Sequence, residues 1–430
     1  MQRILHPRTP WTTISCRSLL GNKSFIHSSP RTHFRFTLKQ EARSEIPSFR
    51  EKVAPEIRPE AFTEKVGKPR AGKQVLFVVI GSLFAFSYAA QRTSIETEFW
   101  KKKLAAQTNI WNSAVTTIDL KRAQQTEFVK RIREWFTETN VKLQDLPTVI
   151  RSWAAGGLVA VLQPWVDASE GKRLCWKLCM LNAAVWAAWK IPRWQPTMAV
   201  RFMHNPLSGL SYTLLTSMFS HRGLLHLLMN CLALEGFGSA AYYFLVKGQA
   251  EEQPPMLEST ASFHFLSFFI SAGLFSGLVS HVVATKFRYP RLVAQLASQA
   301  NNTKKVDTWA AAVSATSGTA ATTAAKKTIP DILPSLGASG AIYATVTVTA
   351  LAFPDSQIAL FIPPSYPINI QWGVGGLVAM DMIGILRGWR MFDHWAHLGG
   401  AAFGAAYYAY GPKVWQSFRQ ALEIKMPEER

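Results

Sequence analysis

Four polar side chains lie in or beside apolar stretches, where they could together hydrolyse a peptide bond. They are Ser339, His397, His226 and Asn230. A serine hydroxyl becomes an effective nucleophile when a neutral imidazole accepts its proton, and the resulting imidazolium can protonate the leaving amine. Polar groups inside membrane-length apolar segments are costly, so they are candidates for function.

These residue types predict distinct roles. His397 would be the general base for Ser339. His226 and Asn230 are four residues apart and share one helical face, where their N–H groups could stabilise an oxyanion, together with the Ser339 amide at a helix N-terminus. No aspartate is placed to complete a triad in an obvious way, so a Ser–His dyad is expected. Tyr343, one turn after Ser339, is expected to stack on the His397 ring.

Small residues indicate how two of these segments could approach each other. Gly400 and Gly404 follow His397 at i+3 and i+7, and Gly340 and Ala344 have the same four-residue spacing. Matched small-x-x-x-small stripes let membrane helices pack backbone to backbone. Such packing would bring His397 to Ser339, with Gly337 supporting the turn before the nucleophile.

Composition points to a membrane protein. The chain has 430 residues, of which 48% are hydrophobic and 17% charged, with 15 Trp and 26 Phe. The net charge of +20 could suggest a nucleic-acid partner, but a basic nucleic-acid-binding face would not come with so many uncharged apolar runs. No nucleic acid is expected. The four cysteines show neither a disulfide framework nor zinc-ribbon spacing and are expected to be packing residues.

The N-terminal stretch has the composition of a targeting segment. Residues 1–40 contain seven Lys and Arg, many Ser and Thr, and no Asp or Glu. This pattern is typical of an organelle transit peptide and lacks the apolar core of a secretory signal. Residues 1–73 are therefore interpreted as a mitochondrial presequence and linker; a disordered basic tail is the alternative.

The remaining chain is expected to be an all-α, multi-pass membrane protein. The expected parts are an extra N-terminal transmembrane helix at 74–91, an amphipathic helical connector at 92–172, a catalytic domain at 173–411 and a tail at 412–430. The catalytic domain holds six apolar segments at 174–189, 224–246, 263–284, 341–353, 370–386 and 394–410. Its Ala/Thr/Lys-rich insertion at 286–334 is of low complexity and is expected to carry no chemistry.

Charge predicts the orientation of these segments. The loops after the first, third and fifth of the six segments carry many Lys and Arg, whereas the opposite loops carry few. By the positive-inside rule the basic loops lie on the matrix side of an inner mitochondrial membrane. An additional N-terminal span that starts in the matrix gives the same orientation, and the start of the segment with Ser339 falls on that side.

The motifs resemble those of the rhomboid intramembrane serine proteases, in particular their mitochondrial, presenilin-associated rhomboid-like branch. The resemblance covers roughly 174–411 and rests on Ser220-His221, His226-x-x-x-Asn230, Gly337-x-Ser339-Gly340 and Ala396-His397-x-x-Gly400-x-x-x-Gly404. The Trp-Arg pair common in the first long loop of bacterial rhomboids is missing.

The resemblance implies a rhomboid six-helix bundle with one extra N-terminal helix (1+6). It implies Ser339 as nucleophile, His397 as base, and His226 and Asn230 as oxyanion donors. It also implies cleavage of single-span membrane proteins in the mitochondrial inner membrane, without a cofactor; in fungal members a dynamin-like GTPase is a possible substrate.

Other classes fit the sequence less well. An intramembrane metalloprotease requires His-Glu-x-x-His, which is absent, and no ligand cluster accompanies His394 and His397, so no metal is expected. An aspartyl intramembrane protease requires two membrane aspartates, and Asp381, interpreted as hydrogen-bonded packing, is the only clear one. A catalytically inactive, client-binding rhomboid-like protein remains the alternative, although such proteins typically lack the Ser or the His. A transporter would be expected to show an internal repeat or broken helices.

Overall fold

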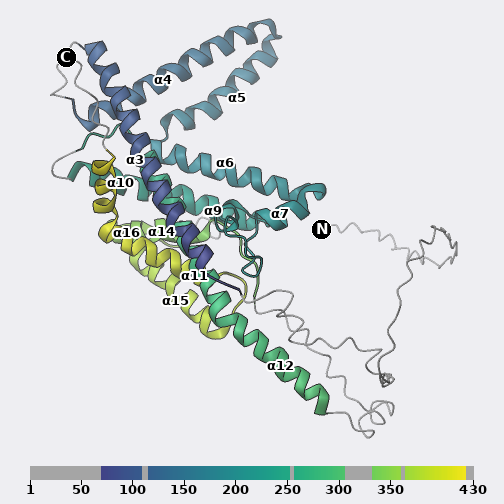
Figure 1. Ribbon diagram of the computed structural model, residues 1–430. Coiled ribbons are helices and arrows are strands. Elements are labelled where there is room, and N and C mark those ends of the chain that lie inside the picture. Colours follow the sequence, from purple (N-terminus) through teal and green to yellow (C-terminus); the bar gives the residue numbers. More distant parts are fainter. Residues whose placement is uncertain (1–68, 109–114, 252–255, 306–331, 360–363, 423–430) are drawn as a thin grey trace, which may run out of the picture. The chain divides into compact units, whose positions relative to one another are not determined.

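The computed structural model describes residues 69–108, 115–251, 256–305, 332–359 and 364–422. The expected presequence, most of the linker, the centre of the insertion and the end of the tail lie outside these ranges. The described chain is mostly helical (Figure 1). Its α-helices are α3 (Gly72–Thr108), α4 (Thr117–Lys142), α5 (Thr148–Asp167), α6 (Glu170–Lys190), α7 (Gln195–Arg201), α8 (Thr213–Thr216), α9 (Leu224–Ala233), α10 (Ser239–Glu251), α11 (Ser262–Val283), α12 (Tyr289–Lys305), α14 (Ser339–Ala352), α15 (Ile370–Arg387) and α16 (His394–Ala421).

Short elements connect these helices. One π-helical turn, Leu234–Gly238, joins α9 to α10, and another, Ala284–Arg288, joins α11 to α12. A two-stranded antiparallel sheet pairs β1 (Gln357–Ile358) with β2 (Ile368–Asn369) ahead of α15. Three single turns of 3₁₀ helix occupy Leu143–Asp145, Pro192–Trp194 and Ser217–Phe219.

Three helical stretches of the described chain are long and apolar enough to cross a membrane. They are Gly72–Ala106, Leu224–Gln249 and Ser262–Ser298; Ser339–Ala352 is apolar but shorter. The first continues well beyond the expected end of the N-terminal span at residue 91. A hydrocarbon core needs about 20 apolar residues of helix, which the 14 residues of α14 do not reach.

The polar region after α3 forms two further helices. A reciprocal pair of hydrogen bonds between Thr116 and Asp119 caps the N-terminus of α4, and this satisfies amide groups that have no partner within the helix. The Thr116 hydroxyl and the Thr116 amide both donate to the Asp119 carboxylate, and these hydrogen bonds lower the pKa of Asp119. Helix α5 follows and contacts α4.

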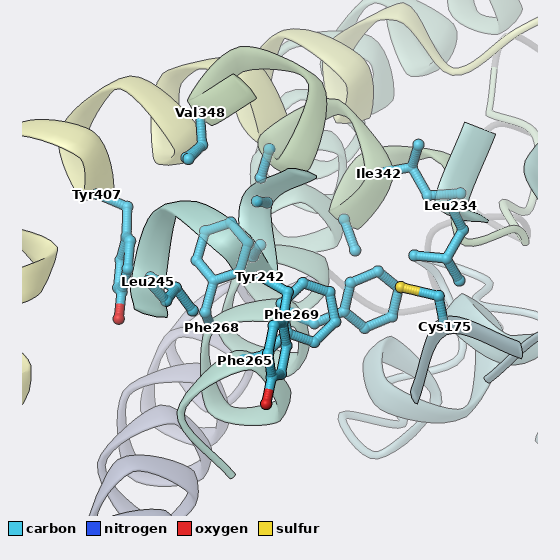
Figure 2. Packing of buried hydrophobic residues seen from close by; sticks show 14 of the residues in the cluster. Cys175, Leu234, Tyr242, Leu245, Phe265, Phe268, Phe269, Ile342, Val348 and Tyr407 are labelled. Carbon is cyan, nitrogen blue, oxygen red and sulfur yellow. The ribbon is translucent and has the colours of Figure 1, made fainter. Parts of the chain in front are cut away.

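The core of the described chain gathers around α11 and α14. Phe265, Phe268 and Phe269 of α11 are almost completely buried among side chains from α6, α10, α14 and α16 (Figure 2). Helix α14 is buried on nearly every side, which explains its uniformly apolar sequence. It contacts α11, α15 and α16, and α3 contacts α11 and α16. In a membrane such contacts depend on close van der Waals packing rather than on the exclusion of water.

A buried polar cluster joins α16 to the segment that precedes α11. Glu258 forms an ion pair of 2.7 Å with Arg419 and accepts a hydrogen bond of 2.8 Å from the Trp415 indole. Gln249 of α10 also donates to this carboxylate. The His264 ring stacks on Trp415 with centroids 4.1 Å apart. Buried charges need such partners, so the cluster fixes the C-terminal half of α16.

Candidate active site

Ser339 is the first residue of α14, directly after a turn that requires glycine. Gly337 has φ +128°, and a Cβ at this position would lie 2.8 Å from Cε1 of His226. A side chain would thus be strained by the backbone conformation and would also meet the imidazole. The Gly337 amide donates to the Ser217 carbonyl at 2.9 Å. The chain upstream of Ser339 is therefore held close to both the 217–221 segment and His226.

The structure brings Ser339 and His397 together. The Ser339 Oγ lies 2.9 Å from the His397 Nε2, although 58 residues separate them in the sequence. The Tyr343 ring stacks on the His397 ring, with centroids 4.6 Å apart and an interplanar angle of 11°. Stacking restricts rotation of the imidazole, so Nε2 stays directed at the hydroxyl.

Glycines allow α14 and α16 to approach each other closely beside Ser339 and His397. A Cβ at Gly404 would lie 2.6 Å from the Ala344 carbonyl oxygen and 2.9 Å from its Cα, and a Cβ at Gly400 would meet the Gly340 carbonyl. These neighbours are backbone atoms, which cannot rotate away. On the other side of Gly340, Ser276 of α11 donates to the Ala396 carbonyl at 2.8 Å. The short distance between Ser339 and His397 therefore depends on the absence of side chains at these positions.

The sequence predicts a Ser–His dyad, with no aspartate obviously placed to complete a triad, whereas the structure places Asp381 beside His397. Oδ1 of Asp381, which is fully buried in α15, lies 3.2 Å from the His397 Nδ1 and 2.5 Å from the His394 Nδ1. The Tyr343 hydroxyl donates to Oδ2 at 2.5 Å. Because a carboxylate only accepts, it favours the tautomer with hydrogen on Nδ1, which leaves Nε2 of His397 free to accept from Ser339.

A signal for this contact was present in the sequence. Asp381 is the only acidic residue of α15, and a carboxylate in an apolar helix requires partners. Asp381 is hydrogen-bonded, as the sequence predicts, but the sequence does not identify the histidines as its partners. Their identity depends on how α15 packs against α16.

The two predicted oxyanion residues are placed differently. His226 lies beside Gly337 and borders the same cavity as Ser339 and His397. The Asn230 amide instead donates to the His226 carbonyl at 2.7 Å, and Asn230 is absent from the described lining of that cavity. The structure therefore places His226 at the same cavity as the serine, whereas the Asn230 amide bonds to the backbone of its own helix.

His221 is a further residue near the nucleophile, and it precedes α9. Its Nε2 lies 3.4 Å from the Ala338 amide, which donates to it. Burial and the neighbouring His226 lower the pKa of His221 to about 4. The ring is therefore neutral at neutral pH and can accept this hydrogen bond, which orients the peptide before Ser339.

A cavity of about 760 Å³ opens at the start of α14. Ser339, His226 and His397 border it together with side chains of α11, the Ala284–Arg288 turn and the segment between α15 and α16. Serine, histidine and arginine side chains line part of it, and a hydrolytic site inside a membrane requires such polar groups for water to enter. Arg288, Arg291, Leu333 and Pro334 also border it, so the two ends of the 286–334 insertion form part of the cavity wall.

One group of possible metal ligands occurs in the described chain. The side-chain ligand atoms of Asp381, His394 and His397 lie within 4.8 Å of one another, and all three residues are buried. Their nitrogen–oxygen contacts of 2.5 and 3.2 Å are hydrogen-bond distances, and the same atoms orient His397.

Part of the chain matches a known domain family. A rhomboid domain model matches residues 209–413, a range that contains His226, Ser339, Asp381 and His397. The presenilin-associated rhomboid-like protein, mitochondrial, of Mus musculus is 29% identical over 280 residues, covering 64% of this chain and 59% of that protein. The protein of the same name from Homo sapiens is 29% identical over 264 residues, with coverages of 60% and 54%.

A fungal relative gives a similar match. Rhomboid protein 1, mitochondrial, of Saccharomyces cerevisiae is 26% identical over 250 residues, which cover 58% of this chain and 56% of the yeast protein. The chain thus spans between 54% and 59% of the length of these curated relatives.

Proposed function

This chain carries a rhomboid domain and is a distant homologue, at 26–29% identity, of the mitochondrial rhomboids, and from this premise we propose that it is an intramembrane serine protease. It hydrolyses peptide bonds in or near the transmembrane segments of single-span membrane proteins. The observation that carries the proposal is the 2.9 Å approach of Ser339 Oγ to His397 Nε2 at the border of a cavity.

The proposed reaction begins with proton transfer from Ser339 to His397. As the hydroxyl attacks the scissile carbonyl, Nε2 of His397 takes its proton, and the imidazolium then protonates the leaving amine. Water attacks the resulting ester with the same histidine as base, which releases the second product and restores Ser339. Asp381 holds the tautomer of His397 and stabilises the imidazolium through Nδ1.

The negative charge on the tetrahedral intermediate needs hydrogen-bond donors. The Ser339 backbone amide is at the N-terminus of α14 and has no partner within the helix. The His226 ring lies beside Gly337, two residues before the serine. Asn230 is the third proposed donor, and this role requires its amide to leave the His226 carbonyl. Loss of one such donor typically costs about 2.7–4 kcal/mol of barrier.

The proposed setting is the mitochondrial inner membrane, with a presequence and linker at 1–73. In this arrangement α3 is the extra span, α4 and α5 form the connector, and α6, α9–α10, α11, α14, α15 and α16 form the six-helix domain at 173–411. The uneven distribution of basic loops supports an active site that opens toward the matrix. A dynamin-like GTPase with one membrane span is a candidate substrate.

Cleavage of a membrane-anchored reporter tests the proposal. The full-length protein should cleave the reporter, whereas Ser339→Ala and His397→Ala should reduce cleavage to background while the variants still insert into membranes. Cleavage by either variant at the wild-type rate would contradict the proposed mechanism. A protein that binds the reporter without cutting it would instead be a client-binding rhomboid-like protein.

A further inference from the structure

The cavity at Ser339 has a basic wall. Arg288 and Arg291 are three residues apart and, with Ala284 and Phe287, form one continuous helical face that borders the cavity. The π-helical turn Ala284–Arg288 inserts an extra residue between α11 and α12, and such turns are frequent at functional sites. Arg390, between α15 and α16, borders the cavity from another side.

Arginines outnumber acidic residues among the described residues that line this cavity. Asp393 is the only acidic residue in its described lining, and its carboxylate accepts from the Ser280 hydroxyl at 2.6 Å and from the Ala396 amide at 3.2 Å. Within the described ranges, neither Arg288 nor Arg291 forms an ion pair. The N-termini of α14 and α16 also face this region, and helix N-termini carry partial positive charge.

The reacting groups share the cavity with these arginines. Whatever occupies the space beside Ser339 and His397 also lies beside Arg288 and Arg291. A substrate is the molecule that must enter there, so the positive wall acts on the polypeptide that flanks the scissile bond. Complementary charge contributes mainly to selectivity between partners.

We propose that Arg288 and Arg291 select substrates with acidic residues in the polar segment next to the cleaved bond. This inference rests on the proposed protease activity and names its substrate class. A carboxylate on the substrate would pair with the guanidinium groups, with bidentate geometry available to each. A lysine at the same position would be repelled by both, so the contrast between acidic and basic flanks is larger than either effect alone.

The test uses three reporters that share one membrane span and differ only in the flanking polar segment, which carries Glu, Gln or Lys. The full-length protein is reconstituted in phosphatidylcholine vesicles, which carry no net charge. We expect the Glu reporter to be cleaved about five- to tenfold faster than the Lys reporter. Raising the ionic strength should shrink this ratio because salt screens partly exposed charges.

Charge reversal of the wall supplies the decisive comparison. Arg288→Glu combined with Arg291→Glu should invert the preference, so that the Lys reporter is cleaved faster. The matched control is Arg193→Glu combined with Arg201→Glu, because both arginines are exposed and lie outside the described cavity lining. The control variant should keep the wild-type ratio. An unchanged ratio in the Arg288/Arg291 variant overturns the proposal.

Two further outcomes separate this inference from the protease activity. If Ser339 reacts with a fluorophosphonate and the Gln reporter is cut, but flank charge has no effect, only the inference fails. If no reporter is cut and Ser339 is unreactive, the protease activity fails and the inference with it. If the Arg288/Arg291 variant slows all three reporters equally, and only in vesicles that contain anionic lipid, the arginines bind lipid phosphates and the proposal is wrong.

Discussion

Oδ1 of Asp381 lies 3.2 Å from Nδ1 of His397, on the side of the imidazole opposite Ser339. This contact links three helices, because Asp381 is in α15, His397 in α16 and Ser339 in α14. A buried carboxylate in this position fixes the tautomer and the orientation of the base. It therefore has a consequence for catalysis that can be measured.

Asp381→Asn should lower kcat by about 10²-fold or more, because the amide no longer favours hydrogen on Nδ1 of His397. KM should change little, since the side chain does not border the described cavity. Tyr343→Phe is the matched control: it removes the 2.5 Å hydrogen bond to the same carboxylate but keeps an aromatic ring over His397. Its loss in kcat should be smaller, and equal losses would contradict the role of Asp381.

Gly404→Ala should destabilise the protein by about 1–3 kcal/mol, because its Cβ would lie 2.6 Å from the Ala344 carbonyl oxygen. Pushing α16 away from α14 should also reduce cleavage. Thermal unfolding in detergent measures the first effect and reporter cleavage the second. Gly376→Ala in α15 is the control, since a Cβ there meets nothing within 4 Å. If Gly376→Ala lost as much stability as Gly404→Ala, the contact between α14 and α16 would not be the cause of the loss.

Gly337→Ala should abolish most cleavage, because φ is +128° and the new Cβ would approach His226. Gly209→Ala separates the two causes: Gly209 also has positive φ, at 72°, but a Cβ there has nothing within 4 Å. Each change should cost about 1–3 kcal/mol of stability through backbone strain. Only Gly337→Ala should lower kcat, as compared by cleavage assays at matched amounts of folded protein.

Arg419→Ala should destabilise the protein by about 3–5 kcal/mol, because it removes the guanidinium that pairs with the buried Glu258 carboxylate. Combining it with Glu258→Gln should recover part of the loss, since the buried negative charge is then removed. Denaturant unfolding of the three variants forms a double-mutant cycle. Additive losses would mean that the pair is not coupled.

Much of the site could be predicted from local sequence patterns. Ser339 stands before an apolar run, and His397 shares its helical face with Gly400 and Gly404, so the spacing itself suggested a close contact between two helices. The membrane character followed from the same apolar runs. These signals are all readable within about ten residues.

The features of the site that could not be predicted depend on how each helix is rotated about its axis. Helix α15 is apolar on all sides, so nothing in its sequence says which helix Asp381 faces. Similarly, the 286–334 segment has the composition of a flexible insertion, yet the π-helical turn continues α11 into α12 and carries Arg288 and Arg291 to the cavity. The Asn230 amide bonds to its own helix, and sequence spacing does not distinguish this contact from an oxyanion role.

The central claim is that Ser339 is a nucleophile activated by His397. Labelling of the membrane-inserted, full-length protein by a fluorophosphonate probe, read out on a gel and by mass spectrometry of the modified peptide, tests it most directly. We predict that Ser339 is labelled in the wild type, that His397→Ala slows labelling by at least about 10²-fold, and that Ser339→Ala is not labelled. Labelling of Ser339→Ala at the wild-type rate, or an unreactive Ser339 in a protein that still cleaves its reporter, would contradict the claim.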